Sequence, residues 1–529
     1  MKLKNDLYNE FGQMGLVSPE AYSTAWVAMV PDADDLSRPA WPQALEYLRL
    51  HQLADGGWGE PAIYFAHERL IATLAAILAF ATWNEPADAG YIARGLEAVH
   101  RYAEYLLSEF ESPTGFELLL PALLTRLEPF GLDLPSGLWS EELRQVTARK
   151  MSLIGKLEID YTRPRSWWFS MEALPEERLA EIDERILNRH GSIVTSTATT
   201  AAYLRALRQH GRDSAHAAAF LAHVLKLGGG AVGFCWPVEV FELVWVLDTF
   251  RRAGFSPTDR EIALLIKELA VVYDTAPMGL SSSRAFSVND CDDTAIGYLV
   301  LRWGGQNPAA QPFLNFWRTN YFSTYLDERT PSVSTNVHAL AALRANLASY
   351  EHKQLAIHVT NWLYEQLDRQ LELYDKWHIS PLYMCSHAIS ALVGWDDDLA
   401  RRCMEYLLHK QHSNGGWGSG ERPNIEETSL VVLGLGAAWE AGYLKDDIPL
   451  KLARHFLDSQ RGAHPSERLW IGKTLYQPIG IIAGTIYAAK AVLAKQEAIC
   501  WRRSRTFAMG DNTFTHSFTN YQGMPGFCL

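Results

Sequence analysis

The sequence predicts an all-α protein, and three observations support this prediction. Apolar residues recur at three- and four-residue spacing, as in residues 261–275 (EIALLIKELAVVYDT) and 338–367. Turn-forming clusters such as RWGGQNP and HSNGGWGSGERP separate these segments. Alternating polar and apolar residues, which are typical of strands, are hard to find. We therefore expect many short helices packed as antiparallel hairpins.

An internal repeat predicts that these helices form two related domains. Residues 47–59 read YLRLHQLADGGWG and residues 406–418 read YLLHKQHSNGGWG, with the Gln and the Gly-Trp-Gly at the same spacing. A helix should end near the Gln, the glycines should make the turn, and the Trp should fold back onto the helix end. This role is structural and not catalytic. The glycine-rich segment 226–234 is the expected domain boundary.

The composition limits the kinds of partner. The 529 residues are 48% hydrophobic and 21% charged, which is typical of a globular protein with a large core. The net charge of −13 argues against nucleic acid as a partner, because phosphate binding needs a basic face. Most of the 18 Trp, 22 Tyr and 21 Phe must pack the core, and some could line a cavity for a large apolar or cationic ligand.

Cysteine usage and hydropathy predict a cytoplasmic protein with no stable membrane insertion. The six cysteines form no CxxC pair and no zinc spacing, so we expect them to be reduced. Residues 1–15 contain no apolar signal region. No uninterrupted apolar run approaches the roughly 18 residues of a membrane helix.

Three aspartates crowd into the segment 288–303 (VNDCDDTAIGYLVLRW), where Asp290, Asp292 and Asp293 precede an apolar stretch. Three explanations are open. Aspartates suit the positive end of a helix, although a cap accounts for only one or two of them. A calcium loop would need a DxDxDG pattern and a later Glu, and neither is present. The third explanation is a strong acid, since crowded carboxyl groups cannot all ionise and one keeps its proton.

Two other features could be mistaken for catalytic groups. Residues 31–39 (PDADDLSRP) repeat the DxDD spelling, but they lie between prolines with no apolar helix after them, so we expect a solvated loop. His338 lies on the apolar face of a predicted helix, where a lone histidine is typically a hydrogen-bonded core residue.

With these residues in view, the chain resembles the bacterial class II diterpene cyclases of the copalyl diphosphate synthase kind. The segment 290–295 (DCDDTA) matches the DxDDTA motif of that family. Other family motifs are matched in order along nearly the whole chain by AYSTAWVAMV (21–30), QLADGGWGE (52–60), GFELLLPALL (115–124), WPVEVFELVWVLDTFRRAGF (236–255), DKWHISPLY (375–383) and LWIGKTLYQP (469–478). Any one of these motifs is weak, but the ordered set is specific. Ser23 departs from the family, which has Asp at this position.

The resemblance implies a fold of two α-barrel domains, called β and γ in this family, with the active site between them. Residues 1–18 would form the N-terminal helix of the β domain. Residues 19–230 would form the inserted γ domain, and residues 231–529 would complete the β domain and carry the DxDD motif.

The resemblance also implies a chemistry for the aspartates. In this family the middle aspartate of DxDD is a general acid, so Asp292 would protonate the terminal alkene of geranylgeranyl diphosphate, with Asp290 and Asp293 orienting and polarising it. The resulting carbocation requires a cavity that excludes water and presents π faces. The product would be a bicyclic diterpenyl diphosphate that keeps its diphosphate, in agreement with the absence of the DDxxD motif of ionising terpene synthases. Such an enzyme is an isomerase, and a downstream class I terpene synthase would use its product.

Two departures from the family concern the final deprotonation. Plant members that make ent-copalyl diphosphate hold a water between a His and an Asn, and this water removes the last proton. Phe169 and Phe234 occupy the matching positions here. The enzyme could use a different base or fold its substrate differently. Alternatively, a longer-lived cation would allow hydride and methyl shifts and give a rearranged product of the kolavenyl or halimadienyl type.

The diphosphate needs cations, and the resemblance suggests where they lie. Lys473 and Lys376 fall inside family motifs and are candidates for contact with the diphosphate, although either could be an ordinary exposed lysine. Mg²⁺ would bridge the diphosphate to carboxylates. Glu109 and Glu111 lie in a region that loosely resembles an acidic motif of the family, and they are the candidate metal ligands.

Other functions remain open. The enzyme could make copalyl diphosphate without shifts, or convert farnesyl diphosphate to drimenyl diphosphate. A triterpene cyclase would usually be longer and carry more of the Gln/Trp repeats. An (α/α) barrel glycosidase also uses a protonated carboxyl group, but it would need a second carboxylate across a cleft. A helical scaffold without chemistry would be unaffected by loss of Asp292.

Overall fold

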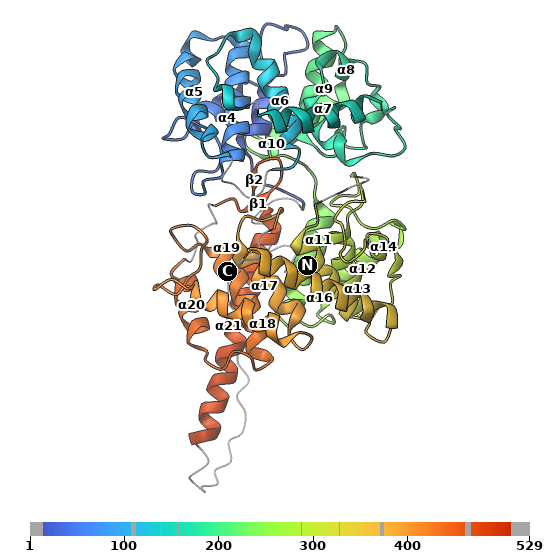
Figure 1. The fold of residues 1–529 in the computed structure, drawn as a ribbon, viewed down its shortest axis with the longest axis vertical. Coiled ribbons are helices and arrows are strands. Elements are labelled where there is room, and N and C mark those ends of the chain that lie inside the picture. The colour runs from blue at the N-terminus through green and yellow to red at the C-terminus, as the bar shows by residue number, and fades with distance from the viewer. Residues whose placement is uncertain are drawn as a thin grey trace.

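The protein is almost wholly helical and forms two lobes (Figure 1). The computed structural model describes residues 14–508, except for residues 107–112, 139, 157, 287, 327, 329, 371–374 and 461–466. Within these ranges the strands form a single two-stranded antiparallel sheet. The prediction of an all-α protein is therefore confirmed.

The first lobe places its most apolar helices at the centre. Its helices are α2 (Ala21–Ala28), α3 (Pro42–Leu50), α4 (Ala66–Trp83), α5 (Ala89–Ala103), α6 (Phe116–Leu127), α7 (Glu141–Lys156), α8 (Glu176–Ala180), α9 (Thr197–Gln209) and α10 (Ala215–Leu227). Helix α2 packs against α4 and α9, and α4 packs against α6. Every residue of α2 and nearly every residue of α4 is buried, whereas α5 buries only one face. The apolar composition of α2 and α4 thus assigns them to the inner layer.

The second lobe is a closed ring of inner helices. Its helices are α11 (Glu239–Arg252), α12 (Arg260–Asp274), α13 (Cys291–Trp303), α14 (Gln311–Leu314), α15 (Val333–Arg344), α16 (Tyr350–Gln370), α17 (Pro381–Leu392), α18 (Asp397–His409), α19 (Ile425–Glu440), α20 (Ile448–Ser459) and α21 (Ile479–Ala508). Helix α11 contacts α13, and contacts continue through α15, α17, α19 and α21 back to α11. The other helices lie outside this ring and bury one face each, as α18 does. This layering is the expected α-barrel.

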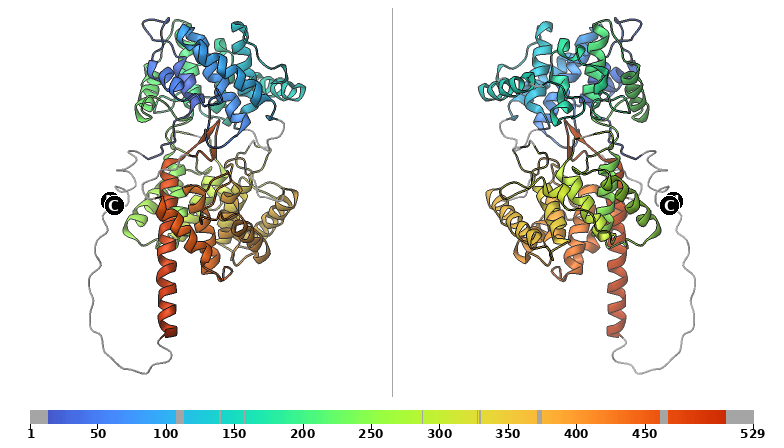
Figure 2. Two further views of the ribbon diagram at one scale, coloured as in Figure 1. Left: turned by 90° about the vertical axis from the view of Figure 1, so that its left-hand side faces the viewer. Right: turned by 90° about the vertical axis from the view of Figure 1, so that its right-hand side faces the viewer.

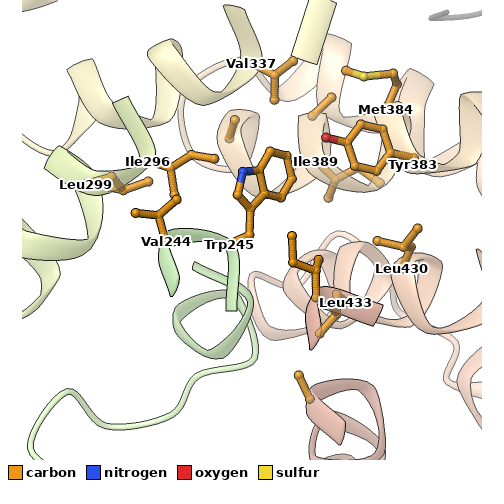
Figure 3. Close-up of a cluster of buried hydrophobic side chains, with 14 of the residues drawn as sticks. Val244, Trp245, Ile296, Leu299, Val337, Tyr383, Met384, Ile389, Leu430 and Leu433 are labelled. Carbon is orange, nitrogen blue, oxygen red and sulfur yellow. The ribbon is translucent and has the colours of Figure 1, made fainter. Parts of the chain in front are cut away.

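Buried aromatic and aliphatic side chains fill the middle of the ring. Trp245 from α11 and Tyr383 from α17 lie among apolar side chains of the neighbouring inner helices, including Ile296, Val337 and Ile389 (Figure 3). Both residues are nearly inaccessible to solvent: Trp245 is 4% exposed and Tyr383 is 1% exposed. The packing fixes these two rings in place.

Each lobe has its own hydrophobic core. One core consists of buried residues between Ala21 and Leu225 together with Val232 and Phe286, and the other runs from Phe234 to Leu493 and includes Val17. The described residues that precede α2 therefore contact the second lobe, where the Gly15 N–H donates to Glu242 at 3.1 Å. The predicted boundaries 1–18, 19–230 and 231–529 stay a proposal, and most of the predicted N-terminal helix lies outside the described residues.

The sequence repeat has the same structure in both lobes. Trp58 Nε1 donates to the Leu48 carbonyl at 2.8 Å, and Trp417 Nε1 donates to the Leu407 carbonyl at 2.7 Å, so each indole caps the end of the preceding helix. The amides of Gln52 and Gln411 each donate to a glycine carbonyl in the turn and to a carbonyl of a neighbouring segment. The predicted structural role of the repeat is confirmed.

A short hairpin joins the lobes. Strands β1 (Trp470–Ile471) and β2 (Leu475–Tyr476) pair in antiparallel register between the two lobes (Figure 1). The Gly472 carbonyl accepts a hydrogen bond from the Thr114 N–H of the first lobe at 2.8 Å. A Cβ atom on Gly472 would lie 2.9 Å from the ring of Phe234, so only glycine allows this close approach.

The long helix α21 follows the hairpin and completes the ring of the second lobe. Its first half contributes buried residues such as Ile481, Ala489 and Leu493 to the core, and its second half extends beyond the lobe (Figure 2).

Candidate active site

A cavity lies between the two lobes, and we call it the interlobe cavity. It encloses an empty space of about 1000 Å³, part of which is open to solvent. Thr114, Ser166, Phe169 and Thr195 of the first lobe line it, as do Trp470, Ile471, Gly472 and Tyr476 of the hairpin. The second lobe contributes the remaining wall, including all three predicted aspartates. The structure thus brings Asp290, Asp292 and Asp293 together at one cavity.

The aspartates are held by the start of helix α13. Asp290 is the residue before the helix, and its Oδ1 accepts a hydrogen bond from the Asp293 N–H at 2.8 Å. The explanation of a helix cap is therefore correct for Asp290. Asp292 and Asp293 lie in the first turn, where the positive end of the helix stabilises negative charge.

Burial acts in the opposite direction on the flanking carboxyl groups. Asp290 and Asp293 are 5% and 3% exposed. Burial, followed by the charge of Asp293, raises the pKa of Asp290 well above its ordinary value. Burial, followed by the charge of Asp292, raises the pKa of Asp293 to about 7. A hydrogen bond between the two carboxyl groups raises the pKa of Asp290 and lowers that of Asp293. The neutral form of Asp290 is therefore favoured more than that of an exposed aspartate.

Asp292 makes a short hydrogen bond to a histidine of the neighbouring inner helix. His338 Nδ1 lies 2.5 Å from Asp292 Oδ1. His338 is buried and hydrogen-bonded, as expected of a core histidine, but its partner is the predicted acid. Its second ring nitrogen, Nε2, lies 2.8 Å from Nδ1 of His387, and Nε2 of His387 lies 2.8 Å from Nη1 of Arg252. The sequence did not predict this line of hydrogen-bonded side chains.

Aromatic rings form much of the cavity wall around the aspartates. Trp245 donates its indole N–H to Asp293 Oδ1 at 3.2 Å, and its ring meets those of Phe241 and Trp470 edge to face, with 5.3 Å between ring centres in each pair. The other aromatic residues of the lining are Phe169, Phe234, Phe286, Tyr325, Trp377, Tyr383 and Tyr476. This wall presents π faces and edges to any occupant of the cavity.

Phe169 of the first lobe and Phe234, which belongs to the core of the second lobe, both line the cavity. Their ring centres are 5.8 Å apart in an edge-to-face pair, and the ring centres of Phe234 and Tyr476 are 4.5 Å apart. The two phenylalanines leave this part of the wall apolar. Neither phenylalanine ring can hydrogen-bond a water, unlike the His and Asn expected at these positions from the plant enzymes that the sequence resembles.

Lys473 is fully buried and paired with a carboxylate. Its Nζ lies 2.5 Å from Glu172 Oε1 and donates to Ser196 Oγ at 2.8 Å, so the hairpin is tied to the first lobe by this ion pair. Burial lowers the pKa of Lys473. The ammonium lies 4.7 Å from the ring centre of Phe169, just behind the cavity wall. Its predicted contact with a diphosphate stays a prediction.

Lys376 also has a carboxylate partner. It forms an ion pair with Glu328, donates to the Thr330 carbonyl, and lies 5.2 Å from the ring centre of Trp377, which lines the cavity. Among the described residues of the cavity lining, none is Lys or Arg. Either lysine would have to exchange its carboxylate partner to bind a diphosphate.

The proposed magnesium ligands Glu109 and Glu111 lie outside the described residues. Within the part of the chain that the structure describes, no three His, Cys, Asp or Glu side chains are grouped as a metal site would require. The predicted Mg²⁺ site stays a prediction.

Several smaller expectations can be compared with the structure. The segment 31–39 is a surface loop in which Asp34 and Asp35 are exposed, as predicted. Four cysteines are free and buried, and the other two have no described side chain. None of the described helices combines the length and the apolar composition that crossing a bilayer requires.

Comparison with known proteins identifies relatives. No protein-family model matches the chain. A type B diterpene cyclase of Mycobacterium tuberculosis is 28% identical over 492 residues, which cover 89% of this chain and 95% of that protein. The bifunctional levopimaradiene synthase of Ginkgo biloba is 33% identical over 308 residues, covering 57% of this chain. The match spans 34% of that plant protein, about a third of its length.

A solved structure supports the same relationship. The ent-copalyl diphosphate synthase from Streptomyces platensis matches with a TM-score of 0.75 and 26% sequence identity, covering 92% of this chain and 98% of that chain. The two-lobed helical fold is thus shared over almost the full length. The predicted resemblance to the bacterial class II diterpene cyclases is therefore confirmed.

Proposed function

We propose that this protein is a class II diterpene cyclase that converts geranylgeranyl diphosphate to a bicyclic diterpenyl diphosphate. One observation carries the proposal: the carboxyl group of Asp292 lines a cavity with an aromatic wall while the rest of the residue is buried. An acid of this kind has no use in a water-filled binding site. It suits an apolar substrate with a reactive double bond.

The first step is a proton transfer to carbon. The O–H bond of Asp292 breaks and its electron pair stays on the carboxylate, while the π electrons of the terminal alkene form a new C–H bond. The substrate becomes a tertiary cation. The remaining double bonds then attack in turn and close two rings, and loss of a proton from carbon restores an alkene. The C–O bond to the diphosphate stays intact, so no ionising metal cluster takes part.

The cavity wall stabilises the cation and directs ring closure. The rings of Trp245, Tyr383 and Trp470 lie beside the aspartates, and their π faces attract positive charge without acting as nucleophiles. Their fixed positions favour one folded shape of the substrate. Magnesium and the two lysines would serve the diphosphate end.

The apolar pair Phe169 and Phe234 favours a rearranged product. Without a polar group or a held water at this position, the bicyclic cation would lose its proton more slowly. Hydride and methyl shifts could then precede deprotonation, which leads to a product of the kolavenyl or halimadienyl type.

Other products and substrates are alternatives. A base elsewhere in the cavity would give copalyl diphosphate, and a shorter effective cavity would favour farnesyl diphosphate and drimenyl diphosphate. An (α/α) barrel glycosidase is disfavoured, because the carboxyl groups among the described lining residues all come from one turn, residues 290–293.

Replacement of the acid tests the proposal. We expect Asp292→Asn to lower turnover of geranylgeranyl diphosphate by about 10³-fold or more, because general acid catalysis is lost. Geranylgeranyl diphosphate, farnesyl diphosphate and squalene are supplied in parallel, and products are identified by mass spectrometry after dephosphorylation.

The loop at residues 31–39 offers a matched control. Asp34→Asn changes the middle aspartate of the same DxDD spelling on an exposed loop, and it should leave turnover unchanged. Wild-type turnover by Asp292→Asn, or no turnover of any prenyl diphosphate by the parent protein, would refute the proposed function.

The rate should depend on pH through Asp293. Its pKa is raised to about 7, so the group is neutral below this pH and negative above it. A negative charge on Asp293 opposes the negative charge that develops on the neighbouring carboxyl group during proton transfer. We therefore expect kcat to fall as the pH rises through about 7. In Asp293→Asn the fall should occur only at higher pH. The amide oxygen of this variant can still accept the hydrogen bond from the Trp245 indole N–H. A kcat that is constant from pH 6 to 9 in both proteins contradicts this role of Asp293.

The product tests the role of the two phenylalanines. We expect NMR of the dephosphorylated product to show a shifted halimadane or clerodane skeleton. The double variant Phe169→His/Phe234→Asn should move the product toward unshifted copalyl diphosphate, because the two polar groups can hold a water, whereas Phe169→Leu should not. An unshifted labdane skeleton from the parent protein would rule out the rearrangement.

A further inference from the structure

A continuous line of hydrogen-bonded side chains leads from the acid through the inner ring of helices. It begins at Asp292 on α13, passes through His338 on α15 and His387 on α17, and ends at Arg252, the last residue of α11. The contact distances are 2.5, 2.8 and 2.8 Å. Four helices of the ring thus supply one side chain each.

The chemistry of the last member gives this line a direction. A guanidinium group has only donors, so Nε2 of His387 must accept from Arg252. A neutral His387 then carries its proton on Nδ1 and donates to Nε2 of His338. His338 in turn carries its proton on Nδ1 and donates to Asp292 Oδ1. Each ring nitrogen has one assigned role.

We propose that Arg252 is a positioning residue that fixes the tautomers of His387 and His338, and thereby keeps Asp292 Oδ1 an acceptor and its proton on Oδ2. This inference rests on the proposed function of Asp292 as the acid. The reacting proton is then held on the oxygen that does not bond to His338. The hydrogen bond from His338 also stabilises the carboxylate that forms when Asp292 loses its proton.

Without Arg252 the donor and acceptor roles along this line of hydrogen bonds could be reversed. Each neutral histidine has two tautomers, and no charged donor would select between them. In the reversed arrangement His338 Nδ1 is unprotonated and accepts a hydrogen bond from the protonated Asp292. The acidic proton then lies between oxygen and nitrogen and is not available to an alkene. Selection of the tautomer is therefore equivalent to selection of an active acid.

The surroundings of Arg252 support this role. Its Nη2 donates to Ser386 Oγ at 3.0 Å and its Nε donates to Ser390 Oγ at 3.2 Å, so the guanidinium is anchored to the helix that carries His387. The charge of Asp248 acts on Arg252, but Asp248 forms its ion pair with the neighbouring Arg251 at 2.8 Å. Burial, followed by the charge of Arg252, lowers the pKa of His387 well below its ordinary value, which keeps this histidine neutral. The aromatic rings of Trp245 and Tyr383 pack against His387 and exclude other donors.

The experiment compares Arg252→Met with Arg252→Lys in the full-length chain. Lysine, like arginine, can only donate, so it should preserve the direction, whereas methionine should not. We expect Arg252→Met to lower kcat for geranylgeranyl diphosphate by about 10-fold or more with KM changed less than about twofold, which is the signature of a lost transition-state interaction. Arg252→Lys should retain most of kcat.

A direct reading of the tautomers does not depend on turnover. With ¹⁵N-labelled histidine, NMR distinguishes protonated from unprotonated ring nitrogens, and His387→Leu assigns the signals of the pair. In the parent protein both histidines should carry the proton on Nδ1. Arg252→Met should give a mixture or the opposite tautomers, and Arg252→Lys should resemble the parent.

The outcomes separate the two proposals. Protonated Nε2 atoms in the parent protein, or unchanged tautomers and unchanged kcat in Arg252→Met, would overturn the inference. If the parent protein turns over no prenyl diphosphate, the proposed function fails, while the NMR comparison still decides whether Arg252 sets the direction. An unfolded Arg252→Met, detected by circular dichroism, leaves Arg252→Lys and the parent tautomers to decide the question.

Discussion

The proposed function depends on one constraint: the carboxyl group of Asp292 must be shielded from water and still be able to give its proton to an alkene. Burial raises the pKa of the flanking carboxyl groups of Asp290 and Asp293. Asp292 lies between them in the first turn of α13, with its Oδ1 at 2.5 Å from Nδ1 of His338. In the proposed function, this shielded group is the source of the proton that starts cyclisation.

The architecture maintains this shielding. The ring of six inner helices places Trp245, His338 and His387 around the acid, since each helix directs one face to the centre. The other wall of the cavity comes from the first lobe and from the hairpin at residues 470–476. The buried ion pair of Lys473 with Glu172 ties this hairpin to the first lobe, so that it closes the cavity from above the second lobe. Removal of one partner from such a buried pair is strongly destabilising, because the other charge is left buried and unpaired.

Much of this could be predicted from the sequence. Periodicity gave the helices, and the spacing of Gln and Trp in the repeat gave the two caps. Crowding of charge left three explanations open for the aspartates, and only the resemblance to the DxDDTA motif indicated an acid. The partners of the acid could not be predicted, because His338 and His387 lie 46 and 95 residues from Asp292 and meet it only when the ring closes. Spacing within a helix carries no information about contacts between helices. The lysines were identified as cations, but their carboxylate partners Glu172 and Glu328 come from distant segments.

The most direct test of the central claim is the fate of the transferred proton. The protein is incubated with geranylgeranyl diphosphate in D₂O, and the product is analysed by NMR after dephosphorylation. If Asp292 protonates the terminal alkene, each product molecule carries one deuterium, at the ring carbon derived from that alkene, and the oxygen–carbon bond of the diphosphate is intact. A cyclised product without deuterium at this carbon, or with the diphosphate lost during cyclisation, would contradict the account.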